Sequence, residues 1–347
     1  MIIIKILVLD YASDKGGANR ISGYINDEML NDTKNHWLLI TSVFQPIENS
    51  RVKNISVPWI KKSLLSRLWF EKVILPQIIK NFGPDVVFSL QNLKTKAFKG
   101  PQVVYLHQSL PFVNYPLKSK FNGIAKLKIK LLSRLIKKDV KTTDLILVQT
   151  QFMLDQVKKY NKNVVQVMPK LFNDHSDTTH KANDFIYPTS AQNYKRFDLV
   201  EQIAEMIKKK QLKMHILLTL EGNENENLVR LKQKTSAEKL PIEFIGYQNQ
   251  KQLKELYKTH NLLFTSEIES LGLPLIEAMH FGCKILAYDI PVTREVLGDY
   301  PYKVLFQSKD IENSLQLFYK GLTTPSKGHD IESTSLLKIL RENHLID

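Results

Sequence analysis

The 347-residue sequence contains one cysteine, Cys283, and therefore cannot form an internal disulfide. That cysteine usage is typical of a reducing compartment such as the cytosol. No apolar run approaches the roughly 18 residues that span a bilayer. The first ten residues show no basic leader, so we interpret residues 2–9 as a strand. With 43% hydrophobic and 24% charged residues, the composition excludes a disordered chain, a collagen-like repeat and a disulfide scaffold.

Several sequence signatures of catalytic sites are also missing. There is no Asp-x-Asp pair, no cluster of His, Cys and carboxylates at metal-ligand spacing, and no complete G-x-G-x-x-G fingerprint. From these absences we predict a chemistry that uses neither a metal ion nor another cofactor.

The positive charge of the chain is concentrated in its first half. The chain carries 49 Lys and Arg against 35 Asp and Glu, a net charge of +14. Residues 1–175 hold 27 basic and 12 acidic side chains, or +15, whereas residues 176–347 hold 22 and 23, or −1. This asymmetry predicts an anionic partner for the first half: nucleic acid, an anionic membrane surface or a phosphorylated substrate.

Short apolar runs alternate with amphipathic stretches along the whole chain. Such alternation predicts parallel sheets covered by helices on both faces. The polar stretch over residues 173–184 has no apolar periodicity and marks a boundary. We therefore expect two doubly wound α/β domains with a cleft between them. The domains would be residues 1–175 and 183–328, and in the remaining residues 329–347 a helix over 331–343 would cross back to the first domain. We expect six strands in each half, at 2–9, 37–41, 86–90, 103–106, 145–148 and 164–167, and at 185–187, 215–219, 242–245, 262–265, 284–287 and 304–306.

The strongest chemical signal is F-T-S-E-I-E-S-L-G-L-P-L-I-E-A-M, residues 264–279. A strand ends near Thr265, and Pro274 is well placed to open a helix. Free backbone amides over residues 271–273 would then form an anion site at the helix start. Glu269 and Glu277 would accept hydrogen bonds from sugar hydroxyls beside that anion. The alternative is that Glu277 only complements the helix dipole and Glu269 is a solvated loop residue.

This string resembles the E-x7-E signature of retaining family-4 glycosyltransferases, which have the GT-B fold of two Rossmann-like domains. The resemblance continues through E-F-I-G-Y at residue 243, N-L-L-F-T-S at residue 261 and P-V-T-R-E-V at residue 291. It implies a retaining, metal-independent hexosyl transfer from a nucleotide-diphosphate sugar, with UDP slightly favoured over GDP, to a glycan hydroxyl.

The resemblance also implies roles for individual residues. Glu269 would bind the transferred sugar, the backbone of Leu271, Gly272 and Leu273 the diphosphate, and Glu277 the ribose. Lys195 and Arg196, within residues 187–198, would neutralise the diphosphate, and His107 would lie near the donor sugar. The other implied donor contacts are Gly16, Gly17, Gly246, Tyr247 and Ser270. Taken without the resemblance, Gly16 and Gly17 are better interpreted as a plain turn and His107 as a structural histidine, and Lys195 and Arg196 are equally well a solvated helix start.

Residues 118–141 combine nine basic side chains with apolar residues at helical spacing, namely Phe121, Ile124, Leu127, Leu131, Leu135 and Ile136. Residues 59–70 have a similar character. Such helices can lie on an anionic bilayer; alternatively, their apolar stripes pack on the sheet and their lysines are merely solvated. With the resemblance, the first possibility favours a cytoplasmic enzyme, peripheral on the inner face of the cell membrane. Its acceptor would be a lipid-linked or lipopolysaccharide glycan, as in assembly of the O antigen or another bacterial surface polysaccharide.

Two other classes of function compete with this interpretation. A nucleic-acid-binding protein would suit the basic first half, although no zinc finger, basic zipper or RNP-like string is present, and we expect no nucleic-acid partner. Another GT-B enzyme, such as a sugar-nucleotide epimerase or a phosphorylase, would share the fold without the same reaction.

Overall fold

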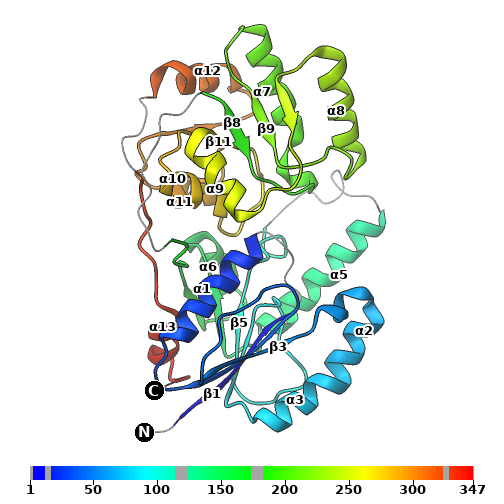
Figure 1. The fold of residues 1–347 in the computed structure, drawn as a ribbon, viewed down its shortest axis with the longest axis vertical. Coiled ribbons are helices and arrows are strands. Elements are labelled where there is room, and N and C mark those ends of the chain that lie inside the picture. Colours follow the sequence, from blue (N-terminus) through cyan, green and yellow to red (C-terminus); the bar gives the residue numbers. More distant parts are fainter. Residues whose placement is uncertain (1–2, 12–16, 114–122, 173–182, 323–327, 347) are drawn as a thin grey trace. The chain divides into compact units, whose positions relative to one another are not determined.

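The computed structural model describes residues 3–11, 17–113, 123–172, 183–322 and 328–346 (Figure 1). The chain divides into two compact units. The first unit includes residues 1–115, 122–171 and 332–347, and the second includes residues 172–331; only their described residues are discussed. Each unit is built on one sheet whose strand pairs are all parallel. The expected α/β class with two doubly wound sheets is therefore confirmed.

The sheet of the first unit has seven strands in the order β3-β2-β1-β4-β5-β6-β7. The sequence predicted six of them and missed β3. That strand, V-K-N-I-S, is polar at three of its five positions and pairs only with β2 at the edge, so it lacks the apolar run of a central strand. The strands are β1 (Lys5–Asp10), β2 (His36–Thr41), β3 (Val52–Ser56), β4 (Val86–Ser89), β5 (Gln102–Tyr105), β6 (Leu145–Val148) and β7 (Val164–Gln166).

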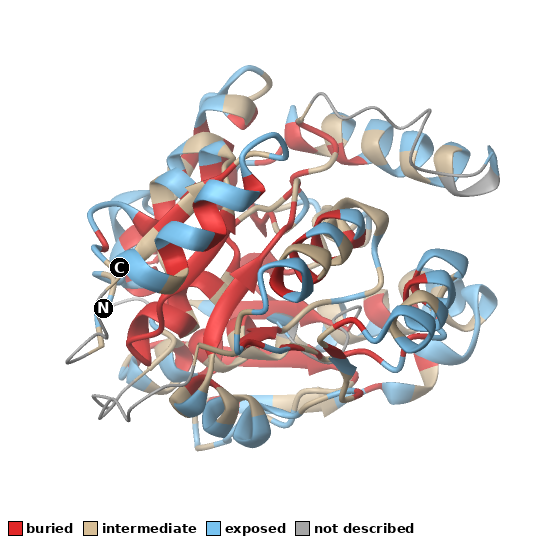
Figure 2. Ribbon diagram, turned by 90° about the horizontal axis from the view of Figure 1, so that it is seen from above, coloured by how far each residue is buried: buried red, intermediate tan, exposed pale blue. Residues whose placement is uncertain are grey.

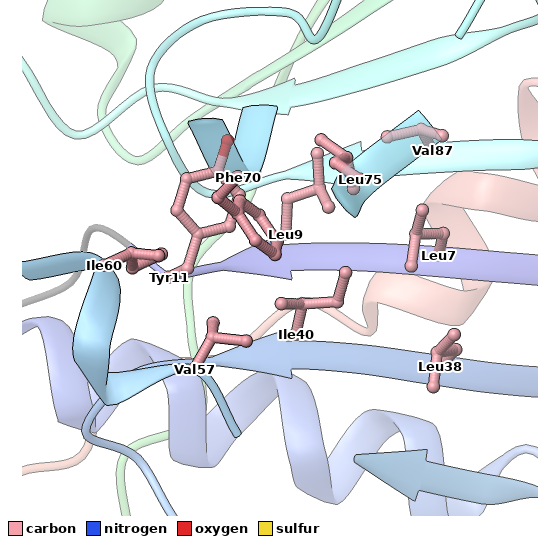
Figure 3. Close-up of a cluster of buried hydrophobic side chains, with 10 residues drawn as sticks. All are labelled: Leu7, Leu9, Tyr11, Leu38, Ile40, Val57, Ile60, Phe70, Leu75 and Val87. Atoms are coloured by element: carbon pink, nitrogen blue, oxygen red, sulfur yellow. The ribbon is translucent and has the colours of Figure 1, made fainter. Parts of the chain in front are cut away.

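Helices cover both faces of this sheet. One large buried cluster joins Leu7 and Leu9 of β1 to Phe70 and Leu75 on the helical segment after β3 (Figure 3). The edge of Phe70 meets the ring of Tyr11, with ring centroids 5.1 Å apart. In the described part of this unit the helices are α1 (Gly17–Asn31), η1 (Pro58–Lys62), α2 (Leu64–Trp69), the π-helical η2 (Phe70–Ile74), α3 (Leu75–Phe82), α5 (Gly123–Val140), α6 (Gln151–Lys158) and α13 (Leu336–Glu342).

The last helix, α13, packs in the first unit against α1. The hydroxyl of Tyr24 donates a hydrogen bond to the carbonyl oxygen of Thr334, 2.8 Å away, and the carboxylate of Glu28 accepts from the amide of Leu337 at 3.0 Å. The helix is shorter than the 331–343 predicted, because Ser335 is its N-cap and accepts from the amide of Lys338. In sequence the second unit is therefore inserted between two parts of the first.

The sheet of the second unit has the order β10-β9-β8-β11-β12-β13, and all six strands predicted for this half are present. The strands are β8 (Phe185–Tyr187), β9 (Ile216–Leu218), β10 (Ile242–Phe244), β11 (Asn261–Phe264), β12 (Ile285–Tyr288) and β13 (Lys303–Phe306). The helices are η3 (Asn193–Lys195), α7 (Phe197–Lys209), α8 (Glu226–Glu238), α9 (Gln250–Thr259), α10 (Leu273–His280), α11 (Pro291–Leu297), α12 (Ile311–Gln316) and the π-helical η4 (Leu317–Gly321). Figure 2 shows the strands buried and the outer faces of many helices exposed.

Candidate active site

Most of the predicted site residues follow two neighbouring strands of the second unit. In its sheet, β8 lies between β9 and β11, so the strand order reverses at the β8–β11 pair. In open parallel sheets, ligands bind beyond the carboxyl ends of the strands at such a reversal. The segment after β8 holds Lys195 and Arg196, and the segment after β11 holds Glu269 and Gly272. The topology therefore gathers these residues at the edge of the sheet where a ligand is expected.

Hydrogen bonds between the two segments fix their backbones to each other. The hydroxyl of Thr265 donates to the carbonyl oxygen of Lys195 at 2.7 Å, and the amide of Glu267 donates to the carbonyl oxygen of Tyr194 at 2.8 Å. The buried hydroxyl of Tyr187, on β8, also donates to the Lys195 carbonyl. Two bonds thus hold the short turn that carries Lys195 against the end of β11, and the third ties that turn to β8.

Lys195 and Glu269 form an ion pair at the centre of this arrangement. The Lys195 Nζ lies 2.5 Å from the Glu269 Oε1, and the side chains are only 13% and 15% exposed. Burial by itself would lower the pKa of Lys195, but the adjacent Glu269 carboxylate raises that pKa above its ordinary value. Lys195 therefore remains positively charged. Its partner in the ion pair, the Glu269 carboxylate, can also accept hydrogen bonds from hydroxyls.

Arg196 has different partners from Lys195. Its guanidinium makes a bidentate contact with Asp198, with Nε and Nη2 each within 3.0 Å of a carboxylate oxygen, and it lies over the ring of Tyr288. The hydrogen bond to Asp198 is the largest cause that raises the pKa of Arg196. Arg196 also starts α7 in the left-handed backbone conformation, with φ of 53°. Of the predicted basic pair, only Lys195 reaches Glu269 among the contacts of the described residues.

The start of α10 supplies backbone donors beside this pair. Gly272 precedes the helix with φ of 75°, and no side chain caps the helix start. A Cβ on Gly272 would lie 2.9 Å from a methyl group of Leu275, so the position favours glycine on both counts. Pro274 has no amide, and the Leu275 amide returns to the Gly272 carbonyl. The Leu273 amide thus has no acceptor within the helix, as an anion site requires. Leu271 is buried and Ser270 is partly buried just before it.

Glu277 is oriented by a tyrosine that the sequence analysis did not single out. The hydroxyl of Tyr257, on α9, donates to the Glu277 Oε2 at 3.0 Å. Tyr257 is 1% exposed, and its ring stacks on Phe281 with the planes 6° apart. The tyrosine lies 20 residues before Glu277, so only the packing of α9 on α10 brings the two together. One signal was available: Tyr257 is the single aromatic residue of α9, and it lies four residues after Leu253, at helical spacing.

Gly246 and Tyr247 follow β10, two strands away from β8. Gly246 has φ of 68°, and a Cβ there would lie 2.4 Å from a carboxylate oxygen of Glu221. Its amide donates to the carbonyl oxygen of Leu220 at 3.1 Å. Tyr247 is 58% exposed. Both residues come just after the last residue of β10, at the carboxyl end of that strand.

The remaining predicted residues belong to the first unit. Gly17 begins α1 after β1, and Gly16 lies outside the described residues. His107 follows β5, where its amide donates to the Asn92 side chain at 2.6 Å and its Nδ1 lies 3.3 Å from the Gln149 amide nitrogen. Its ring packs on Tyr105, with centroids 4.6 Å apart. Burial lowers the pKa of His107 to about 4, so the imidazole is neutral at physiological pH.

Residues 171–334, which include most of the second unit, match the model of a family described as glycosyl transferases group 1. No curated protein matches the chain.

Several solved structures have a similar fold. A structure of WaaG, described as a glycosyltransferase involved in lipopolysaccharide biosynthesis, is 13% identical, with 91% of this chain and 90% of that chain covered and a TM-score of 0.68. A structure of TarM is 12% identical over 99% of this chain and 93% of its own, with a TM-score of 0.67. The Anabaena protein Alr3699/HepE, in complex with UDP and glucose, is 16% identical over 91% and 89%, with a TM-score of 0.59.

The two parallel sheets and these neighbours define the GT-B fold, which confirms the predicted fold class. Together with the match over residues 171–334, they support a GT-B glycosyltransferase. In the part of the chain that the structure describes, no helix is long and apolar enough to cross a membrane.

Proposed function

We propose that this protein is a retaining, metal-independent glycosyltransferase that uses a nucleotide-diphosphate sugar. The observation that carries the proposal is the buried Lys195–Glu269 pair beside the uncapped start of α10, at the reversal of strand order. A cation and free backbone amides suit a diphosphate, and carboxylates suit the hydroxyls on either side of it. Glu269 would bind the transferred sugar, and Glu277 the ribose.

In the proposed reaction, the bond between the sugar's anomeric carbon and the diphosphate oxygen breaks. A new bond forms on the same face of the sugar to the acceptor hydroxyl oxygen, and the hydroxyl proton goes to the departing diphosphate. The leaving group gains negative charge as it departs. Lys195 and the amides over residues 271–273 would stabilise that charge without reorganising, which is the usual source of large rate accelerations.

We further propose a lipid-linked or lipopolysaccharide glycan as the acceptor, with the enzyme peripheral on the inner face of the cell membrane. The net charge of +15 on residues 1–175 supports an anionic surface as partner. Two structural neighbours also fit this proposal by their descriptions, one being the lipopolysaccharide glycosyltransferase WaaG and the other the lipopolysaccharide outer core galactosyltransferase WaaB.

A thermal-shift panel with UDP, GDP, ADP, CDP and NAD, each with and without EDTA, tests the donor site. Because a ligand that binds only the folded state stabilises it, we expect one nucleoside diphosphate, UDP first, to raise Tm unaffected by EDTA. A UDP effect that EDTA abolishes and Mg²⁺ restores would contradict the metal-free claim. No response to any nucleotide would contradict the proposed function.

The substitution Glu277→Ala locates the site within the second unit. A hydrogen bond to a charged group contributes about 1.5–3 kcal/mol, so the loss of the ribose contact should weaken nucleotide binding more than tenfold. Glu226→Ala is the matched control, because Glu226 is an exposed carboxylate in the first turn of α8. Equal affinities of the two variants would remove Glu277 from the site.

A further inference from the structure

The helix α5 turns a leucine stripe away from the body of the first unit. Ile136 and Val140 are buried against the sheet, whereas Leu127, Leu131 and Leu135 are 66%, 57% and 46% exposed. These three leucines are four residues apart, so they form one stripe along the helix. The alternative that this stripe packs on the sheet is therefore wrong for these residues. Phe121 and the side chain of Ile124 lie outside what the structure describes, and Ile136, the last residue of the predicted stripe, packs inward.

A second helix in the same unit, α2, also has large apolar side chains on its exposed side. On α2, Leu64 and Leu65 are 73% and 76% exposed, and Trp69 is 52% exposed. The helix is held in place by what surrounds it, because Ser63 caps its start and Phe70, directly after it, is fully buried. These large apolar side chains therefore face outward from a well-anchored helix.

Both helices cover the same face of the seven-stranded sheet. Phe70, after α2, packs on Leu7 and Val87, and Ile136 of α5 packs on Ile146. The strand register relates these positions. Leu7 pairs with Val87, and Val87 pairs with Gln102. Val104 lies two residues after Gln102 in β5 and pairs with Ile146. Residues that pair, or that are two apart in a strand, share a face. Figure 1 likewise draws α2 and α5 along one side of this sheet.

Positive charge surrounds the exposed leucines. Residues 58–74 and 123–141 together contain eleven Lys and Arg but only two acidic residues, Glu71 and Asp139. Both carboxylates are already engaged: Glu71 pairs with Arg67, and Asp139 accepts from the backbone amide of Lys94. The lysines beside the stripe, such as Lys128 and Lys130, are exposed. We call the exposed residues of these two segments the α2–α5 surface.

We propose that the α2–α5 surface binds an anionic lipid bilayer, with the leucines and Trp69 in the interface and the lysines on the headgroups. An interfacial helix combines an apolar face with flanking cations in this way. Phosphates of a nucleic acid would take the lysines but would leave the leucines in water, which is why a bilayer suits the surface better. The inference rests on the proposed function in one respect, that membrane docking would bring the enzyme to a lipid-linked acceptor.

Vesicle co-sedimentation at low salt tests the surface, with phosphatidylethanolamine vesicles containing one third phosphatidylglycerol as the probe. The wild-type protein should bind them and should bind pure phosphatidylcholine vesicles much more weakly. Replacing Lys126, Lys128 and Lys130 with Gln should lower the partition coefficient roughly hundredfold, since each cation near the surface contributes about fivefold. Replacing Leu127, Leu131 and Leu135 with Gln should lower it by about tenfold or more, because apolar area no longer enters the interface.

Matched controls in the second unit keep the test specific. Lys209, Lys213 and Lys251 are exposed lysines, and Leu317 is a 55% exposed leucine. Their replacement by Gln should change vesicle binding less than twofold. All of the substituted positions are at least partly exposed, so the variants should keep the unfolding temperature of the wild-type protein.

Three outcomes would overturn the inference: no binding to the anionic vesicles, binding that the leucine variant retains in full, or tighter binding to a DNA duplex that the leucine variant also retains. The UDP thermal shift of the same proteins separates this inference from the proposed function. A UDP response without vesicle binding would overturn only the surface, and vesicle binding without a nucleotide response would overturn only the donor site.

Discussion

At the scale of single residues, the candidate site depends on side chains outside the motif that drew attention to it. Thr265 and Tyr187 fix the backbone of Lys195, and Tyr257 fixes a carboxylate oxygen of Glu277. The acidic pair of the motif is therefore held by neutral hydroxyls as well as by a cation. A hydrogen bond to one oxygen of a carboxylate restricts the rotation of the whole group, which lowers the entropy lost when a hydroxyl binds.

Removing the Tyr257 hydroxyl should loosen Glu277 without unfolding the unit. We expect Tyr257→Phe to weaken nucleoside diphosphate binding about threefold to tenfold, since one hydrogen bond contributes roughly 0.5–1.5 kcal/mol. Calorimetric titration with UDP measures the change. Tyr300→Phe is the control, because Tyr300 is equally buried and donates to a carbonyl oxygen, that of Cys283. If both variants lose affinity alike, Tyr257 acts through stability rather than through Glu277.

The protonation of His107 should make the free energy of unfolding of the first unit depend on pH. Burial lowers the pKa of His107 from 6.5 to about 4, so between these values the unfolded chain takes up a proton that the folded chain does not. His107 therefore favours the folded state above pH about 6.5, and this contribution is lost as the pH falls toward 4, by at most about 3 kcal/mol. Urea unfolding across that pH range should show a steeper loss for the wild-type protein than for His107→Gln.

The exposed His344, in the same unit, is the control for this measurement. The difference between the wild-type protein and His107→Gln should be larger than the difference between the wild-type protein and His344→Gln. A wild-type profile that coincides with that of His107→Gln would show that His107 is not buried as a neutral imidazole.

At the scale of elements, replacing glycine with alanine should have opposite effects on the free energy of unfolding at two positions. Gly272→Ala should lower the free energy of unfolding of the second unit by about 1–2 kcal/mol, because its φ of 75° strains any other residue and a methyl group would meet Leu275. Gly23→Ala, in the interior of α1 with open space at its Cβ position, should instead raise the stability of the first unit by about 0.5–1 kcal/mol. Thermal unfolding of the two variants compares them directly.

The strands of the fold were predictable where burial on both faces leaves continuous apolar runs, as in the L-I-L-V of β6. The edge strand β3 was not, because one side of it faces solvent and its residues are mixed. The helix predicted over 331–343 was too long by several residues at its start, since Ser335 ends the extended segment by capping α13. Local pattern thus located the elements, and capping and edge position decided their limits.

The site was predictable where its residues are adjacent in sequence to a strand end and a glycine. Glu269, Gly272 and Glu277 fall into this group. The pairing of Lys195 with Glu269 spans 74 residues and follows from strand order. The partner of Arg196 was missed because Asp198, two residues on, competes for the guanidinium at close range. The direction in which the α5 leucines point stayed open between two alternatives, because periodicity shows that a stripe exists without showing which way it faces.

At the scale of the whole molecule, the charge of the chain and its apolar exposure coincide. Among the described residues, the basic half carries eleven of the fourteen large exposed hydrophobic side chains, including those of α2 and α5. In a freely soluble domain such a combination would promote non-specific association. Its concentration on one face of one sheet is instead typical of a surface that has a partner.

The packing of α13 on α1 has a consequence for synthesis in the cell. Leu336, Leu337 and Leu340 are buried in the first unit, although residues 172–331 separate them from the rest of it. During translation the second unit is complete while the first still lacks part of its core. Until the residues beyond 331 have left the ribosome, the side of α1 that α13 covers therefore stays exposed, and a chain interrupted before them would present that side to chaperones and proteases.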